Sequence, residues 1–235
     1  MSVRDVQCDD SRGERKQVRI TVASGKGGVG KSGLVINLAA AAAAAGYTVA
    51  ILDTDTDQHS CVEWRQAGGK LEVIKADPAD VPRVLQRLIN VDFVVIDTCG
   101  AVLASHTAAI DCADLVLIPL STSARERAPA LRTFKKAYAR GRTIRFVLSL
   151  VDPSATEDRL EGRRAEVSSA VKCYLDSAIL SRFFMKTVNT RRVPLRDAMD
   201  QGGSAFTQRS TLRSRIEFEA LLEEIVTIIR TPETI

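Results

Sequence analysis

The sequence lacks the features that mark membrane, secreted or metal-cluster proteins. None of its apolar runs approaches the roughly 18 residues that a membrane-spanning helix requires. Residues 1–17 are polar and charged, without the apolar core of a signal peptide, so we expect a cytoplasmic protein with no stable membrane anchor. The five cysteines are scattered and form no C-x-x-C pair, which argues against a disulfide framework or a metal cluster.

Histidine is also scarce. The two histidines, His59 and His106, are isolated in the sequence, and we expect ordinary surface or helix positions for both. Cys99 has no histidine or other base near it in the sequence, so a nucleophilic role for its thiol is not predicted.

The length of 235 residues suits one α/β domain and would be cramped for two. We expect a flexible arm over 1–17 and a single domain over 18–235. The net charge of +4 is unevenly placed, because the window 181–215 holds eight basic and two acidic residues. This excess predicts a surface for a polyanion, although solvated helix faces or internal ion pairs are the alternative. The candidates for DNA contact are Arg182, Arg191, Arg209, Arg213 and Arg215.

A glycine-rich loop, Gly25-x-x-x-x-Gly30-Lys31-Ser32, organises the chain. An apolar run over 18–23 precedes it and a helix-forming run over 34–45 follows, which is the context that a phosphate-binding loop needs. Glycines let successive N–H groups point at phosphate oxygens, and the helix adds the positive end of its dipole. Lys31 would supply charge for the β- and γ-phosphates, and Ser32 a hydroxyl for Mg²⁺.

Two further apolar runs end in carboxylates. The run over 49–52 ends at Asp53, and the run over 93–96 ends at Asp97. Parallel strands present their carboxyl ends at the edge of the sheet where the glycine-rich loop would lie. We therefore predict Asp97 in the water shell of Mg²⁺. For the acidic segment that starts at Asp53, an exposed turn that caps the next helix is the alternative.

Apolar runs alternate with helix-forming segments along the chain. This alternation predicts an α/β fold of the P-loop NTPase type: a doubly wound, mostly parallel sheet of about seven or eight strands with helices on both faces. The further strands are expected at 71–76 as an edge, 114–119, 144–151 and 178–183. The further helices are expected at 77–89, 104–113, 121–140 after a loop, 152–175 after a loop, 195–200 and 212–230. The apolar face of the last helix is expected to contain Ile216, Leu221, Leu222, Ile225, Ile228 and Ile229.

A second lysine in the loop, Lys26, makes it similar to the K-G-G-x-G-K-[ST] signature of the ParA/MinD superfamily of deviant-Walker-A ATPases. The chain most resembles short ParA-type partition ATPases without a helix-turn-helix domain. The resemblance implies ATP and Mg²⁺ as cofactors. It implies catalytic roles for Lys26, Lys31 and Asp53, with Asp53 positioning the attacking water, and metal ligation by Ser32, Asp53 and Asp97. The implied nucleotide contacts are Gly25, Lys26, Gly27, Gly28, Val29, Gly30, Lys31, Ser32, Gly33, Arg192 and Pro194.

The sequence departs from the family pattern at three points. Gly33 replaces a second hydroxyl residue, and Thr56-Asp57 interrupts the D-x-D-P-Q segment. Ser149 stands where many members place an asparagine that contacts the adenine. These departures leave the α-phosphate contact, the alignment after Asp55 and the adenine contacts open.

The resemblance implies a weak, partner-stimulated ATPase for plasmid or chromosome segregation. ATP would be sandwiched in a homodimer, with Lys26 of each protomer completing the other site. The ATP-bound dimer would bind DNA non-specifically at the nucleoid, and a small DNA-binding adaptor would stimulate hydrolysis, for example a centromere-binding ribbon-helix-helix protein.

Two other functions are compatible with the same fold. A MinD-like, membrane-cycling regulator would need a basic C-terminal amphipathic helix, but the last helix carries Glu217, Glu219, Glu223 and Glu224. A scaffold or conjugation accessory factor with little turnover is the second alternative.

Overall fold

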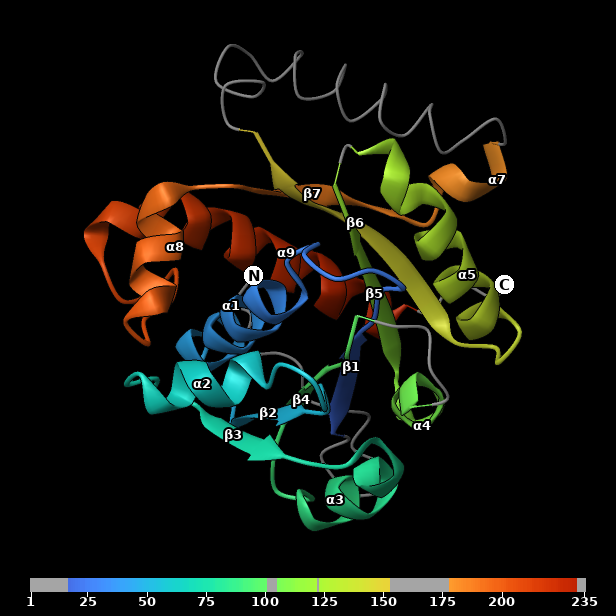
Figure 1. Ribbon diagram of the computed structural model, residues 1–235, viewed down its shortest axis with the longest axis horizontal. Helices are drawn as coiled ribbons and strands as arrows, with labels where there is room; N and C mark the ends of the chain where they lie inside the picture. The colour runs from blue at the N-terminus through green and yellow to red at the C-terminus, as the bar shows by residue number, and fades with distance from the viewer. Residues whose placement is uncertain (1–16, 101–104, 122, 153–177, 232–235) are drawn as a thin grey trace.

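A parallel β-sheet forms the centre of the computed structural model, which describes residues 17–100, 105–121, 123–152 and 178–231 (Figure 1). Seven strands pair in the order β3-β2-β4-β1-β5-β6-β7, and every pairing is parallel. The predicted fold class is confirmed. The strands are β1 (Val18–Val22), β2 (Val49–Asp53), β3 (Glu72–Lys75), β4 (Phe93–Asp97), β5 (Leu115–Leu120), β6 (Thr143–Val151) and β7 (Phe184–Thr190).

Helices cover both faces of the sheet (Figure 1). One face packs against α1 (Lys31–Ala44), α2 (Ser60–Gln66), α8 (Val193–Asp200) and α9 (Leu212–Arg230). The other packs against α3 (Val81–Arg87), α4 (Ser105–Cys112) and α5 (Arg127–Tyr138). Short helical turns are η2 (Pro78–Asp80), η3 (Ala124–Glu126), α7 (Ala178–Ser181) and η5 (Arg209–Thr211).

The central strands are apolar on both sides, as the doubly covered sheet requires. In β4, Phe93 and Val95 belong to the core beneath α1 and α9, whereas Val94 and Ile96 belong to the core beneath α3 and α4. This burial explains why these runs could be recognised from the sequence. The arm over 1–16 and the helix expected within 152–175 lie outside the described residues, apart from residue 152.

The last strand was predicted at the wrong place. Residues 178–181 form α7, and the strand β7 follows at 184–190. The strand is a polar edge, and glutamates of α9 hold it. Glu224 accepts hydrogen bonds from the backbone N–H groups of Lys186 and Thr187, and Glu217 accepts from the Thr190 N–H and hydroxyl. A strand fixed by polar contacts carries no apolar run in the sequence.

The last helix has the predicted bounds, with one correction to its apolar face. Leu221, Leu222 and Ile225 are buried, but Ile216 is 56% exposed. No helix in the described part of the chain is long and apolar enough to cross a membrane.

Candidate functional site

The glycine-rich loop joins β1 to α1 at the carboxyl edge of the sheet. Gly28 and Gly30 have φ values of 76° and 83°, in the left-handed region that favours glycine. Gly30 is the N-cap of α1 and offers no side chain to its first N–H groups. These N–H groups and the helix dipole therefore remain available to an anion.

Gly100, which follows Asp97 by three residues, closes against this loop. A Cβ at position 100 would lie 2.9 Å from the Gly27 nitrogen and 3.0 Å from its Cα, which is too close for real atoms. The segment after β4 is thus packed directly on the glycine-rich loop, and only glycine allows this approach.

Asp97 lies at the centre of the site. It is paired in register with Val22 of β1 and Asp53 of β2, and both carboxylates are fully buried. Burial raises the pKa of Asp97 to about 6, and the neighbouring Asp53 charge adds to the rise, whereas a hydrogen bond from Ser32 and the charge of Lys31 oppose it. The Cys61 thiol lies 3.3 Å from Asp97 Oδ2, while the buried Oδ1 has no hydrogen-bond partner.

This arrangement fits a magnesium ion. A carboxylate oxygen that is buried without a partner is costly, and a hydrated divalent cation would satisfy it. Ser32 and Asp97 are oxygen donors of the kind Mg²⁺ prefers, and Lys31 is buried beside them.

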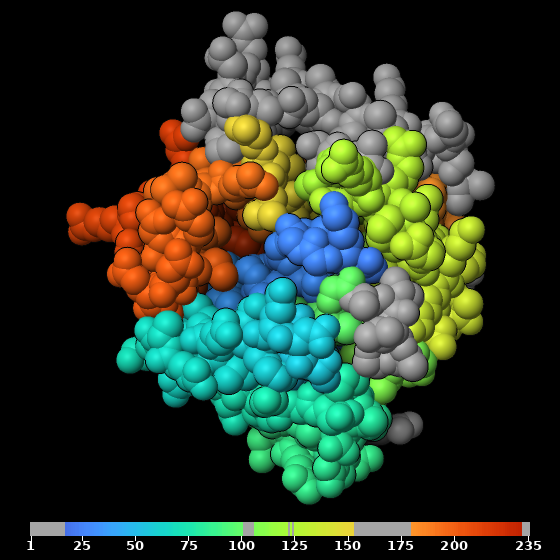
Figure 2. Space-filling model, in the orientation of Figure 1, coloured from blue at the N-terminus to red at the C-terminus, as the bar shows by residue number. Residues whose placement is uncertain are grey.

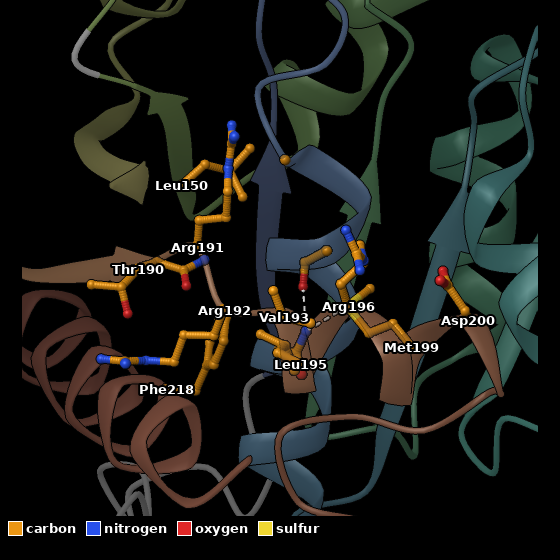
Figure 3. Close-up of a pocket in the computed structure, with 14 residues that line it drawn as sticks. Leu150, Thr190, Arg191, Arg192, Val193, Leu195, Arg196, Met199, Asp200 and Phe218 are labelled. Carbon is orange, nitrogen blue, oxygen red and sulfur yellow. Dashed lines mark hydrogen bonds between the residues drawn. The ribbon is translucent and has the colours of Figure 1, made fainter. Parts of the chain in front are cut away.

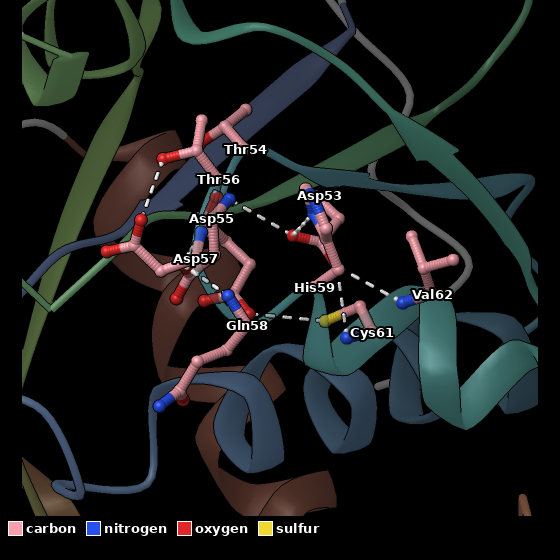
Figure 4. Close-up of polar contacts among 10 residues, drawn as sticks. Asp53, Thr54, Asp55, Thr56, Asp57, Gln58, His59, Cys61 and Val62 are labelled. Atoms are coloured by element: carbon pink, nitrogen blue, oxygen red, sulfur yellow. Dashed lines mark hydrogen bonds and ion pairs between the residues drawn. The ribbon is translucent and has the colours of Figure 1, made fainter.

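Asp53 combines burial with a capping role (Figure 4). Its Oδ1 accepts a hydrogen bond from the Asp55 N–H, and its Oδ2 accepts from the N–H groups of Cys61 and Val62 at the start of α2. Burial raises the pKa of Asp53, and these hydrogen bonds oppose the rise. An ionised carboxylate offers about four acceptor positions, so about one remains for a water molecule. The alternative of an exposed turn that caps the next helix therefore holds in part: Asp53 does cap α2, but it is fully buried, and only Thr56, Asp57 and Gln58 of the turn are exposed.

Lys26 forms an ion pair with Glu126 in η3. Its Nζ lies 3.6 Å from Glu126 Oε1, and the Lys26 side chain is 39% exposed. Glu126 is buried, and its other carboxylate oxygen accepts a hydrogen bond from the Ser121 N–H. The contact joins the glycine-rich loop to the segment that begins α5.

A pocket of about 390 Å³ opens beside the glycine-rich loop (Figure 3). In the space-filling view it appears as a hollow between the blue loop and the orange α8 segment (Figure 2). Apolar side chains, including Leu150 and Met199, line it together with Gly30, Gly33 and Asn189. Leu150, which lines the pocket, has a φ of 56°, and this is a strained backbone conformation for leucine.

Asn189 supplies a polar group at this pocket. Its Nδ2 lies 3.5 Å from the Ser149 hydroxyl, and its Oδ1 is buried without a partner. The residue itself is 6% exposed. The sequence left the adenine contact open at Ser149 on β6 and did not point to Asn189, because only the pairing of β6 with β7 brings the two side chains together.

The comparisons with known proteins agree with this geometry. Residues 20–174, more than half of the chain, match the family model described as the CobQ/CobB/MinD/ParA nucleotide binding domain. The chain belongs to this family. Maintenance of carboxysome distribution protein A from Gloeobacter kilaueensis is 32% identical over 150 residues, which cover 62% of this chain and 68% of that protein.

Other family members share the fold or part of the sequence. Protein ParA from Rhizobium radiobacter is 28% identical over 159 residues, covering 63% of this chain and 71% of that protein. The septum site-determining protein MinD from Pyrococcus horikoshii, solved with Mg-ADP, matches with a TM-score of 0.66 at 18% identity, over 94% of this chain and all of that chain. The ParA/MinD resemblance of the glycine-rich loop is thus confirmed at the level of the family.

The structure brings together the predicted loop residues, Asp53 and Asp97, but it pairs several predicted arginines internally. Arg192 Nη2 lies 3.1 Å from Glu217, and Arg215 Nε lies 2.8 Å from Glu219. Arg192 and Val193 line the pocket, beside Pro194 at the start of α8. Arg182 lies over the ring of Phe183, 5.0 Å from its centroid. The alternative of internal ion pairs therefore holds for Arg192, and Arg215 forms a half-exposed pair on the surface of α9.

His106 lies in a helix, as expected, but its contacts were not predicted. His106 is buried in α4, with its Nε2 3.0 Å from the Cys99 carbonyl oxygen and 3.2 Å from the Cys99 sulfur. Burial lowers the pKa of His106 to about 4, so the ring is neutral at pH 7. Cys99 lies two residues after Asp97, which puts this pair beside the site, and six residues lie between Cys99 and His106 in the sequence.

Proposed function

We propose that this protein is a Mg²⁺-dependent ATPase switch that dimerises on ATP and positions or partitions DNA. The observation that carries the proposal is the cluster of Lys31, Ser32 and the buried, partnerless Asp97 Oδ1 behind an open helix N-terminus. Such a cluster suits a phosphate chain with a divalent cation. Membership of the nucleotide-binding family supports the same ligand.

Each residue of the cluster has a proposed task. Lys31 binds the β- and γ-phosphates, and Ser32 with Asp97 holds the hydrated Mg²⁺. When bound, Mg²⁺ would neutralise charge on the phosphate oxygens. Asp53 orients a water molecule through its remaining acceptor position, while the N–H groups of Cys61 and Val62 keep its carboxylate in place.

The pocket beside Gly30 suits the adenine base. Its walls are mostly apolar, as the faces of a base require, and Asn189 Oδ1 can accept a hydrogen bond from the adenine amino group. Asn189 thus takes the task that many family members give to an asparagine near position 149.

The proposed dimer depends on Lys26. We propose that its ammonium leaves Glu126 and contacts the nucleotide of a second copy, so that each site is complete only in the dimer. In the ion pair with Glu126, the Lys26 side chain is 39% exposed. Ion pairs with a solvent-exposed partner are weak, so the ammonium can exchange Glu126 for another anion. DNA segregation, with an adaptor that stimulates turnover, is favoured by the similarity to Protein ParA.

ATP turnover and binding test this proposal. Lys31→Ala should abolish ATP binding by calorimetry, whereas the matched control Lys70→Ala, at an exposed lysine, should bind normally. Asp53→Ala should retain ATP binding and lose hydrolysis. ATP affinity that is unchanged in Lys31→Ala would refute the phosphate site. Binding without turnover in the wild type, even with DNA present, would favour the scaffold alternative.

A further inference from the structure

The largest local excess of positive charge lies on α5 and its flanks, outside the window 181–215. Residues 124–142 contain seven basic residues and one acidic residue, Glu126. The window 181–215 is nearly twice as long for the same net charge. The one carboxylate in 124–142 is buried and accepts a hydrogen bond from the Ser121 N–H, so it does not neutralise the outer face of the helix, whether or not Lys26 remains beside it.

The helix separates an apolar face from a basic one. Ala130, Phe134 and Ala137 are buried against β5 and β6. Arg132 and Lys135 point away from this face and are exposed, and Arg125 in η3 is exposed as well. In the described part of the chain, none of these three side chains has a hydrogen bond or an ion pair. We call Arg125, Arg132 and Lys135 the α5 surface.

Three arginines of the window 181–215 differ in this respect, whereas Arg182, Arg191 and Arg209 are exposed. Arg192, Arg196 and Arg215 each pair with a carboxylate, those of Glu217, Asp197 and Glu219. At the margin of the α5 surface, Arg140 pairs with Asp111. Because paired charges contribute little to an external field, the α5 surface is the more concentrated cationic feature: its three unpaired cations lie within 125–135, whereas those of the other window are spread over 182–209.

Helix stability does not account for the α5 surface. Lys135 lies in the last turn of α5, where the helix dipole favours a cation, but Arg125 and Arg132 lie before that turn. Neither arginine contacts an acidic side chain at the i+3 or i+4 position, since residues 128, 129, 135 and 136 are Ala, Pro, Lys and Lys.

We propose that the α5 surface binds the phosphate backbone of duplex DNA. This inference rests on the DNA-binding function proposed above and assigns the surface for it. Guanidinium groups match phosphate geometry, and phosphate contacts of this kind carry no sequence information, which suits non-specific binding. A lipid surface is a poorer match, because Tyr138 is the only large apolar side chain with substantial exposure among the described residues of 124–142.

The position of the α5 surface couples it to the nucleotide site. The helix begins next to Glu126, the partner of Lys26, and Figure 2 shows the yellow-green α5 segment flanking the blue glycine-rich loop on the same face of the molecule. A dimer joined through Lys26 would present two α5 surfaces on one body. Binding should then strengthen with ATP through avidity.

The test is charge reversal with a matched control. Arg132→Glu combined with Lys135→Glu changes the charge of each protomer by four units at exposed positions. Lys70→Glu combined with Arg87→Glu makes the same change at exposed positions before β3 and at the end of α3. The affinity for a short mixed-sequence DNA duplex is measured by fluorescence anisotropy, with Mg²⁺ and ATP, over a series of salt concentrations.

We expect the α5 variant to lose about 10–100-fold in affinity near 0.1 M salt and to show a shallower salt dependence, because about two phosphate contacts per protomer are removed. The control should lose much less. ATP binding must match the wild type in both variants. If the α5 variant does not fold, Arg132→Gln with Lys135→Gln replaces it, with a smaller loss expected.

Each outcome decides a separate claim. Wild-type protein that binds no DNA with ATP would overturn the proposed DNA function together with this inference. Wild-type binding with equal losses in the α5 variant and the control would overturn the α5 surface alone, and a selective loss in Arg209→Glu with Arg213→Glu would move the surface to the window 181–215. Preferential binding to vesicles of anionic lipid over DNA would overturn the choice of partner.

Discussion

Asp97→Asn should stabilise the magnesium-free protein while it removes part of the proposed magnesium site. Asp97 is fully buried, and burial raises its pKa from 3.8 to about 6. A carboxyl group whose pKa is higher in the folded state binds protons more readily there than in the unfolded chain. Its contribution therefore makes folding less favourable as the pH rises from about 4 to about 6, and the full penalty is present above pH 6.

The size of the effect follows from the pKa change. A rise of about two units corresponds to a penalty on the order of 3 kcal/mol at pH 7. Asparagine has a similar size, and its amide oxygen can still accept a hydrogen bond from the Cys61 thiol. We expect the variant to gain up to this free energy of unfolding, or about 6–12 °C in Tm for a chain of this length. About half of the gain should remain at pH 5.

The measurement is urea denaturation in a chelator at several pH values between 5 and 8. Glu72→Gln, which removes an exposed carboxylate from β3, serves as the control and should change the free energy of unfolding little. Adding Mg²⁺ and ATP should stabilise the wild type more than Asp97→Asn, because ligand binding stabilises only a competent site. A variant that is less stable than the wild type at pH 7, or a gain that does not shrink at pH 5, would refute the reasoning.

Three further predictions address single contacts. Lys26→Ala should retain nucleotide binding but lose ATP-dependent dimerisation in sedimentation experiments; loss of ATP binding itself would contradict a role across the interface. Asn189→Ala should weaken ATP binding about fivefold, the equivalent of one hydrogen bond, and leave GTP binding unchanged in calorimetry. Cys61→Ala should raise the Mg²⁺ concentration needed for tight ATP binding, whereas Cys61→Ser should not, because its hydroxyl can also donate to Asp97. Equal effects of both Cys61 substitutions would show that the thiol acts through packing alone.

Most of the sheet and the phosphate-binding loop could be predicted because their signals are local. The strand β4 is buried on both faces and therefore appears as an unbroken apolar run that ends in Asp97. The glycine-rich loop has fixed spacing because its backbone conformation requires glycine at Gly28 and Gly30. Local physics of this kind leaves the same trace in the sequence wherever the fold occurs.

The features that were missed depend on contacts between distant segments. The strand β7 is defined by Glu217 and Glu224, which lie on α9 more than 25 residues later. Asn189 reaches the pocket only because β7 pairs with β6, and Cys61 reaches Asp97 only because β2 and β4 are neighbours. No periodicity or motif in the sequence around these residues indicates their contacts.

Charge shows the same distinction between composition and arrangement. The windows 124–142 and 181–215 have the same net charge, and the count of basic residues alone favoured the second. In the folded chain, Glu217 of α9 pairs with Arg192, and Glu219 pairs with Arg215 one turn earlier in the same helix, so part of that charge is neutralised. The acidic residue before α5, Glu126, is buried, and Arg125, Arg132 and Lys135 face solvent close together. A long-range attraction for DNA depends on charge that remains unpaired, so the shorter window is the stronger candidate.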